Sequence, residues 1–229
     1  MEARKSGSVE HRNCTERAPR TDKNMTSRIE KGFSLLELVI TLSLALIMCA
    51  VTFIAIRPMI NQSNVDSGYD TTLMALRNTR NLAITQSHQY YVNFNPAGFP
   101  AGTIQIQYQP PPVGGIAQPL QQVITYTIPT AVSFAVQAGF PASTPDGFGT
   151  GVTAIDFEST PGVPLNYVVF NPDGSAQDSL GNYSSGIVYI TRPTDSLFSS
   201  RAITVWGATG RVRGWRMAKQ AGAWIWVQQ

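Results

Sequence analysis

Three patterns of apolar and polar residues follow one another along the chain. Phe33 to Ile56 is almost continuously apolar and contains a single charged side chain, Glu37. At about 1.5 Å per residue this segment forms a helix of roughly 36 Å, enough to cross a hydrocarbon core of about 30 Å. After Pro58 the apolar residues recur at helical spacing, and from Gln89 they alternate with a period of two. The chain therefore predicts a membrane-spanning helix, an amphipathic continuation and then β-structure.

The amphipathic segment, residues 58–88, carries apolar side chains on one helical face. They are Val65, Tyr69, Leu73, Leu76 and Ala83. We expect this face to pack on the rest of the protein and the helix to continue to about Ser87. Pro58 and Gly68 are both unfavourable inside a helix, so a bend or a looser turn is expected at the start of this segment.

Residues 89–229 are expected to form an antiparallel β domain on which the helix packs, which gives an α+β fold. The expected strands are 90–94, 103–108, 123–128, 132–136, 154–157, 167–170, 186–191, 201–206 and 211–217. Turn sequences such as Asn171-Pro172-Asp173-Gly174 separate them. The apolar tail, 224–227, is interpreted as one more strand, with a contact to another subunit as the alternative. No repeat or hinge divides this region, so a single domain is expected.

The charges are distributed unevenly. The first 32 residues hold eight Lys and Arg against five Asp and Glu, and the rest of the chain holds nine of each. A globally basic nucleic-acid binder is therefore not predicted. The basic residues before the apolar segment favour a cytoplasmic N-terminus, with residues 57–229 across the membrane. Cys14 and Cys49 both lie outside the predicted β domain, which therefore has no internal disulfide.

The apolar segment opens with Lys-Gly-Phe-Ser-Leu-Leu-Glu, residues 31–37. The segment is longer than the apolar part of a secretory signal, and no A-x-A-like cleavage site follows it. Gly-Phe-Ser-Leu-Leu-Glu resembles the class III signal of type IV pilins and pseudopilins, which a membrane-embedded prepilin peptidase cuts after the glycine. The resemblance implies cleavage between Gly32 and Phe33, N-methylation of Phe33, and a role for Phe33 and Glu37 in assembly.

A charged Glu37 inside an apolar segment needs a physical reason, because a charge at the bilayer centre costs roughly 2.5 to 3.5 kcal/mol or more. Cleavage creates a cationic amine on Phe33, and a carboxylate one helical turn away is its natural partner. In filaments of this class the pair is thought to form between neighbouring subunits. The alternative is that Glu37 lies close enough to the interface to reach water and that the motif is a coincidence.

The predicted leader, residues 1–32, is long for a prepilin leader. A start at Met25 leaves the basic octapeptide Met-Thr-Ser-Arg-Ile-Glu-Lys-Gly. We therefore hypothesise that residues 1–24 are an over-extended start.

The later part of the chain resembles the GspH/FimT group of minor pseudopilins and minor pilins, and the resemblance spans roughly Lys31 to Arg213. The matching segments are 76–84, 169–175, 203–205 and 210–213. The resemblance implies a structural subunit of a type II secretion pseudopilus or a type IV pilus, held first in the inner membrane. Its partners are then prepilin peptidase and other pilin subunits. The alternative from another class is a membrane-anchored periplasmic binding or sensor domain that does not polymerise.

No catalytic constellation is present in the sequence. Asp156 and Glu158 share one face of an expected strand and are interpreted as solvated. There is no Cys/His cluster, P-loop or nucleophile elbow. We expect no enzymatic activity, no metal and no cofactor.

The segment Gly210-Arg211-Val212-Arg213 is the one candidate binding motif. On a regular strand, Arg211, Arg213 and Trp215 point to one face at intervals of about 6.6 to 6.8 Å. Guanidinium groups and an indole suit phosphates and bases. In the FimT branch the corresponding Gly-Arg-x-Arg motif is implicated in DNA binding, which implies DNA as a ligand of Arg211 and Arg213. The alternative is an exposed edge strand whose arginines prevent association between sheets.

Overall fold

The computed structural model describes residues 32–194 and 196–229. The predicted leader therefore lies outside the described residues except for Gly32, and the hypothesis about residues 1–24 lies wholly outside them. The chain divides into two compact units, one ending at Met48 and the other comprising Cys49–Gln229. All of the β-structure belongs to the second unit.

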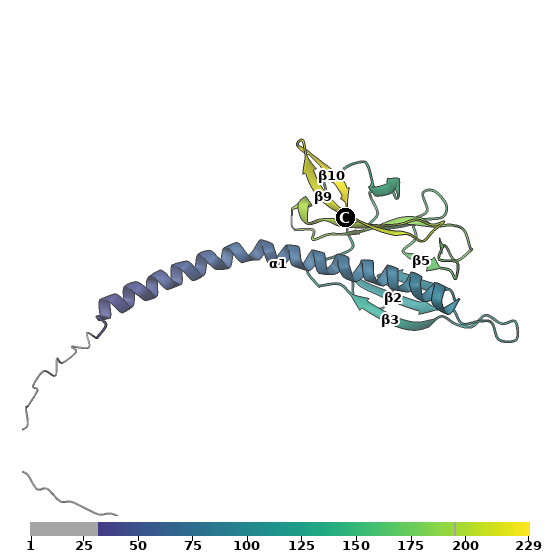
Figure 1. Cartoon of the computed structure of the whole chain (residues 1–229), viewed down its shortest axis with the longest axis horizontal. Helices are drawn as coiled ribbons and strands as arrows, with labels where there is room; N and C mark the ends of the chain where they lie inside the picture. The colour runs from purple at the N-terminus through teal and green to yellow at the C-terminus, as the bar shows by residue number, and fades with distance from the viewer. Residues whose placement is uncertain (1–31, 195) are drawn as a thin grey trace, which may run out of the picture. The chain divides into compact units, whose positions relative to one another are not determined.

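The helix α1, Leu35–Gln86, runs without interruption through Pro58 and Gly68 (Figure 1). It ends within a residue of its expected position, where Ser87 adopts a positive φ of 56°. Gly68 serves close packing, because a Cβ there would lie 3.3 Å from Val132 Cγ1. The helix therefore continues through residues 58–86, with glycine at a position where an adjacent segment comes close.

The first part of α1 is not buried by the rest of the described chain. Leu35–Phe53 has a mean hydropathy of 2.4 and none of it is buried. Within the described residues it is the one helix long and apolar enough to span a membrane. This 19-residue segment lies within the predicted anchor, residues 33–57, which stays a prediction.

The β-strands form two five-stranded antiparallel sheets. The strands are β1 Tyr90–Phe94, β2 Thr103–Tyr108, β3 Gln121–Thr127, β4 Ile155–Glu158, β5 Tyr167–Phe170, β6 Ala176–Gln177, β7 Ser185–Ile190, β8 Arg201–Val205, β9 Val212–Gln220 and β10 Ala223–Gln228. The first sheet has the order β3-β2-β1-β5-β6 and the second the order β10-β9-β8-β7-β4. The fold class is therefore α+β as predicted, although the sequence did not indicate that the strands divide into two sheets.

Two details of the strand prediction are corrected. Residues 132–136 do not form a strand, and Ser133 makes only an isolated bridge with Thr191. The apolar alternation there arises because an irregular segment inserts Val132 and Phe134 into the core. The two-residue strand β6 was not predicted. The expected strand in the tail is confirmed, since every residue of β10 pairs with β9.

One hydrophobic core joins the second part of α1 to both sheets. Its buried members include Leu76 and Ala83 from the helix, Val92 and Ile104 from the first sheet, and Ile203 from the second. A smaller cluster lies on the other face of the second sheet, where Trp215 and Trp226 pack against Tyr189 and Ala202. The second sheet is thus covered on both faces.

Two contacts fix α1 against the second sheet. The buried Arg201 donates Nη2 to Asp66 Oδ1 at 2.7 Å, and its Nη1 also donates to backbone carbonyls of residues 198–200. Gly214 allows the second contact, because a Cβ there would lie 1.7 Å from the Tyr69 hydroxyl oxygen. These contacts set the distance between α1 and strands β8 and β9, and that distance shapes the site described next.

Candidate functional site

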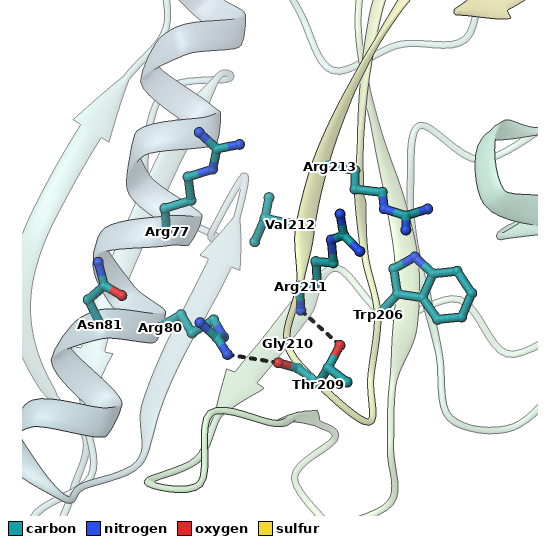
Figure 2. A pocket seen from close by; sticks show the side chains of 9 residues that line it. All are labelled: Arg77, Arg80, Asn81, Trp206, Thr209, Gly210, Arg211, Val212 and Arg213. Atoms are coloured by element: carbon teal, nitrogen blue, oxygen red, sulfur yellow. Dashed lines mark hydrogen bonds between the residues drawn. The ribbon is translucent and has the colours of Figure 1, made fainter. Parts of the chain in front are cut away.

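A cleft of about 730 Å³ lies between α1 and the turn that joins β8 to β9, residues 206–211 (Figure 2). We call it the arginine cleft. Its lining residues are Arg77, Arg80, Asn81, Trp206, Thr209, Gly210, Arg211, Val212 and Arg213. Four of the nine cations in residues 33–229 line it, and no carboxylate is among its described lining residues.

The β8–β9 turn has a tight backbone that depends on Gly210. Gly210 N donates to Trp206 O at 2.7 Å, and Trp206 N donates to Arg211 O at 3.0 Å. Gly210 has a φ of +57°, and a Cβ there would lie 2.0 Å from Gly174 O. Any side chain at Gly210 would therefore displace the turn, and Arg211 with it.

Arg80 connects α1 to two turns of the β domain. Its Nε donates to Gly174 O at 3.1 Å and its Nη2 donates to Thr209 O at 3.0 Å. These bonds satisfy two carbonyls at the bottom of the cleft and fix the guanidinium plane. Nη1 of Arg80 has no hydrogen-bond partner among the residues that the structure describes. Figure 2 shows the Arg80 guanidinium group beside Thr209.

Arg77 and Arg211 have exposed side chains on opposite walls of the cleft. Neither guanidinium has a hydrogen bond or an ion pair within residues 32–194 and 196–229. A cleft lined by one sign of charge concentrates the local field and attracts counter-ions. The arrangement can therefore hold an anion.

Arg213 has a different environment. Its Nη1 donates to Asp146 Oδ1 at 2.9 Å, and its guanidinium carbon lies 5.5 Å from the centre of the Trp206 ring. The other oxygen of Asp146 accepts hydrogen bonds from Thr204 Oγ1 at 2.6 Å and Trp206 Nε1 at 3.2 Å. The Asp146 side chain is only 7% exposed, so its carboxylate is largely removed from water, whereas Trp206 is exposed.

Trp215 also contacts other residues of the β domain. Its Nε1 donates to Thr204 Oγ1 at 3.0 Å, and its ring belongs to the cluster beneath β9 and β10. Of the three residues that the sequence placed on one face, Arg211 and Arg213 line the cleft and Trp215 does not. Strand β9 pairs with β8 through residues 212–216 and with β10 through residues 215–220, so Arg213 lies on a part of β9 that β10 does not pair with, and the edge-strand alternative is not contradicted there.

Sequence reasoning missed four residues of this site, namely Arg77, Arg80, Asp146 and Trp206. Arg77 and Arg80 are three residues apart on α1, so their shared side of the helix could have been recognised. Asp146 could not, because it lies in a loop at the short 3-10 helix η1, Pro145–Gly147, where its own φ is +55°. Its pairing with Arg213 depends on the folding of that loop.

The N-terminal site predicted from the sequence lies at the start of the described residues. Gly32 and Phe33 precede α1, and Phe33 is 77% exposed. Leu38 N donates to Ser34 O at 3.1 Å, so the first turn of the helix begins directly after Phe33. Glu37 is exposed within this first turn. Cleavage, methylation and the role of Glu37 stay predictions.

The expectation of solvated carboxylates on β4 is wrong for Asp156. Its side chain is fully buried, and Oδ2 accepts hydrogen bonds from the backbone N and Oγ1 of Thr150 at 2.8 and 2.9 Å. Burial, with the Asp156 charge as a smaller contribution, raises the pKa of the Tyr189 hydroxyl above its ordinary value. In the part of the chain that the structure describes, no three His, Cys, Asp or Glu residues come together as metal ligands.

Comparison with known proteins gives little further information. No protein-family model and no curated protein matches the sequence. Among solved structures, the chain matches the minor pseudopilin EpsH from the type 2 secretion system of Vibrio cholerae. The match has 8% sequence identity and a TM-score of 0.29, and it covers 70% of this chain and 92% of that chain. A superposition this weak does not establish a common fold or function.

Proposed function

We propose that the chain is a minor pilin-like structural subunit of a type II secretion pseudopilus or a type IV pilus. The observation that carries the proposal is the motif Gly-Phe-Ser-Leu-Leu-Glu, residues 32–37, at the start of a helix whose first part is apolar and exposed. Such a surface requires lipid or other subunits around it.

In this proposal, prepilin peptidase cleaves after Gly32 and Phe33 becomes N-methylated. The subunit waits in the inner membrane with its N-terminus cytoplasmic and its β domain periplasmic. It then assembles when the Phe33 amine of one subunit meets Glu37 of a neighbour. Removal of both charges from water is tolerated because each is paired, and this requirement fixes the register between helices.

Replacement of Glu37 tests the assembly step. We expect Glu37→Leu to be cleaved and to remain in the membrane, but to be lost from sheared filaments or purified pseudopili. Ser43→Ala is a matched control, because Ser43 is also exposed on the helix and its hydroxyl bonds only to the carbonyl of Ile40. Immunoblots of the filament and membrane fractions measure the distribution. Normal incorporation of Glu37→Leu would refute the pairing.

The alternative is a single-pass anchored periplasmic binding or sensor domain that does not polymerise. Such a protein would keep its residues upstream of Phe33 and would be absent from filaments with or without Glu37. The two functions are therefore distinguished by processing and by fractionation.

DNA binding in uptake is a second candidate function. It is favoured by the exposed Arg211 guanidinium in a cleft whose described lining residues include no carboxylate. Arg213 and Trp215, the other residues proposed from the motif, already have partners in Asp146 and Thr204. We expect the full chain in uncharged detergent to bind short DNA in fluorescence anisotropy, with affinity that falls as salt rises. The double variant Arg211→Gln/Arg213→Gln should weaken this binding. If its DNA affinity equals that of the unchanged chain at every salt concentration, the motif is excluded as the DNA site.

A further inference from the structure

We propose that Arg77 and Arg80 of α1 complete an anion site with Arg211, and that this site holds a phosphate group between the helix and the β8–β9 turn. Arg213 is a positioning residue that does not contact the phosphate. The inference rests on the second candidate function, DNA binding, and identifies the side chains and the ligand group involved. The motif in the sequence contains only one of the three contacting residues.

The first argument is the charge left unpaired in the cleft. Arg77 and Arg211 line the same cavity without an ion-pair partner among the described residues, and the same cavity contains Arg80. Like charges gathered in this way repel one another, and an anion placed between them removes the repulsion. The walls come from two elements, so the ligand is held from different directions.

The second argument is preorganisation. Arg80 is held by the carbonyls of Gly174 and Thr209, which fixes its plane and leaves Nη1 as a donor. A side chain that is already ordered loses little conformational entropy when it binds a ligand. Gly210 contributes to the same order, because its missing Cβ allows Gly174 O and the Arg80 side chain to approach the turn.

The third argument excludes Arg213 as a direct ligand. Its guanidinium donates to Asp146 Oδ1 and stacks near Trp206. A phosphate that took this guanidinium would leave the buried Asp146 carboxylate without its charge partner, which is unfavourable. Arg213 instead holds Trp206 and β9 in place, and Arg211, two residues earlier, is thereby oriented toward the cleft.

A phosphate group fits these donors better than a carboxylate does. A planar carboxylate is satisfied by one guanidinium fork, whereas a tetrahedral phosphate presents oxygens in several directions. Three guanidinium groups, two from a helix and one from a turn, can each donate to a different oxygen of a tetrahedral phosphate. The phosphate can belong to a nucleic-acid backbone or to a small soluble ion, and the experiment separates these sources.

The experiment measures binding of two probes to the full chain in uncharged detergent, a fluorescent single-stranded oligonucleotide by anisotropy and inorganic pyrophosphate by calorimetry. We expect Arg77→Gln and Arg211→Gln each to weaken binding about ten-fold, the loss expected for one charge-assisted hydrogen bond. Each should also reduce the salt slope of DNA binding by about one. Arg216→Gln is the matched control, because Arg216 is exposed on β9 and outside the cleft.

Arg213→Lys distinguishes positioning from direct contact. Lysine can keep the charge pair with Asp146, so we expect DNA binding within about two-fold of the unchanged chain, whereas loss of a bidentate Arg contact would be larger. Near-ultraviolet circular dichroism of each variant checks that the tryptophan packing is preserved.

The outcomes separate this inference from DNA binding as a function. If pyrophosphate binds and depends on Arg77 but DNA does not bind, the phosphate site stands and the DNA function is excluded. A second outcome is that DNA binds but that Arg77→Gln leaves the binding unchanged and Arg213→Lys abolishes it. This outcome overturns the inference, while the DNA function stands. Absence of binding by both probes overturns both.

Discussion

The two parts of helix α1 differ in what covers them. Residues 35–53 are apolar and entirely exposed, whereas the second part buries Val65, Leu76 and Ala83 completely. The sequence shows the reason, because the first part is apolar on all sides and the second only at helical spacing. A helix that is apolar all round requires an apolar environment. One part of the helix therefore contributes to the core of the β domain, and the other is the part that we propose for the membrane and for assembly.

The largest expected effect lies in the covered part. Leu76 is 0% exposed, so Leu76→Ala removes buried methyl groups and leaves a cavity in the core that joins α1 to both sheets. We expect a loss of about 2 to 5 kcal/mol in the free energy of unfolding. Tryptophan fluorescence of the full chain in detergent measures it, since the described tryptophans all belong to the second sheet or its turns. A loss no greater than that of a surface substitution would contradict the assignment of this part to the domain.

A smaller effect is expected at the contact between Gly214 and Tyr69. Gly214→Ala places a methyl group on the Tyr69 hydroxyl, which would have to shift, and we expect a cost of about 1 to 3 kcal/mol. Tyr69→Phe removes the oxygen that the methyl group would meet first. The double variant Tyr69→Phe/Gly214→Ala should therefore be more stable than the two single losses added together. Simple additivity in chemical denaturation would show that the contact does not link α1 to β9.

The stability of the β domain is expected to depend on pH through Asp178. Burial opposes ionisation of Asp178, but hydrogen bonds from Asn182, Ser159 and the backbone N–H groups of Asn182 and Leu180 lower its pKa to about 2. Because the ordinary pKa is about 3.9, the stabilisation is present above pH 4 and is lost as the pH falls through about 2.

Thermal unfolding between pH 2 and 7 measures this contribution. Asp178→Asn should lower the melting temperature at pH 7 and flatten its dependence on pH below 4, while the helical signal of residues 35–53 persists in detergent. If the melting temperature of Asp178→Asn falls with pH below 4 as steeply as that of the unchanged chain, the Asp178 carboxylate does not contribute to stability.

The smallest change in the free energy of unfolding is expected for substitutions in the exposed part of α1, residues 35–53. Leu44 is 57% exposed, so Leu44→Ala should change the free energy of unfolding of the β domain by less than about 0.5 kcal/mol. It is the direct counterpart of Leu76→Ala, because the same chemical change is made on the same helix. A loss of similar size at Leu44 and Leu76 would mean that both parts are stabilised by the same core.

Local patterns predicted much of the fold. The end of α1 and strands β1 and β2 follow from periodicity in short stretches of sequence, and the tail strand β10 follows from a short apolar run. Residues 132–136 have the same alternation but no strand, since their apolar side chains are buried without a neighbouring ladder. The division into two sheets could not be predicted, because it depends on which strands pair.

The arginine cleft was predicted only in part, for the same reason. Arg211 and Arg213 were recognised from their spacing on one strand, and their different environments arise from residues far away in the sequence. Arg77 comes from α1 and Asp146 from a loop, and the sequence does not show that α1 or this loop lies beside the β8–β9 turn. The sequence therefore indicated a basic turn, and the structure shows which of its arginines is free.

The measurement that tests the central claim most directly is the N-terminal mass of the mature chain after co-expression with a prepilin peptidase. The account predicts that the chain begins at Phe33 and carries one added methyl group, and that Gly32 is the last residue removed. A mature protein that still carries residues upstream of Phe33 would contradict the claim that this chain is a pilin-like subunit. It would favour an anchored domain that never enters a filament.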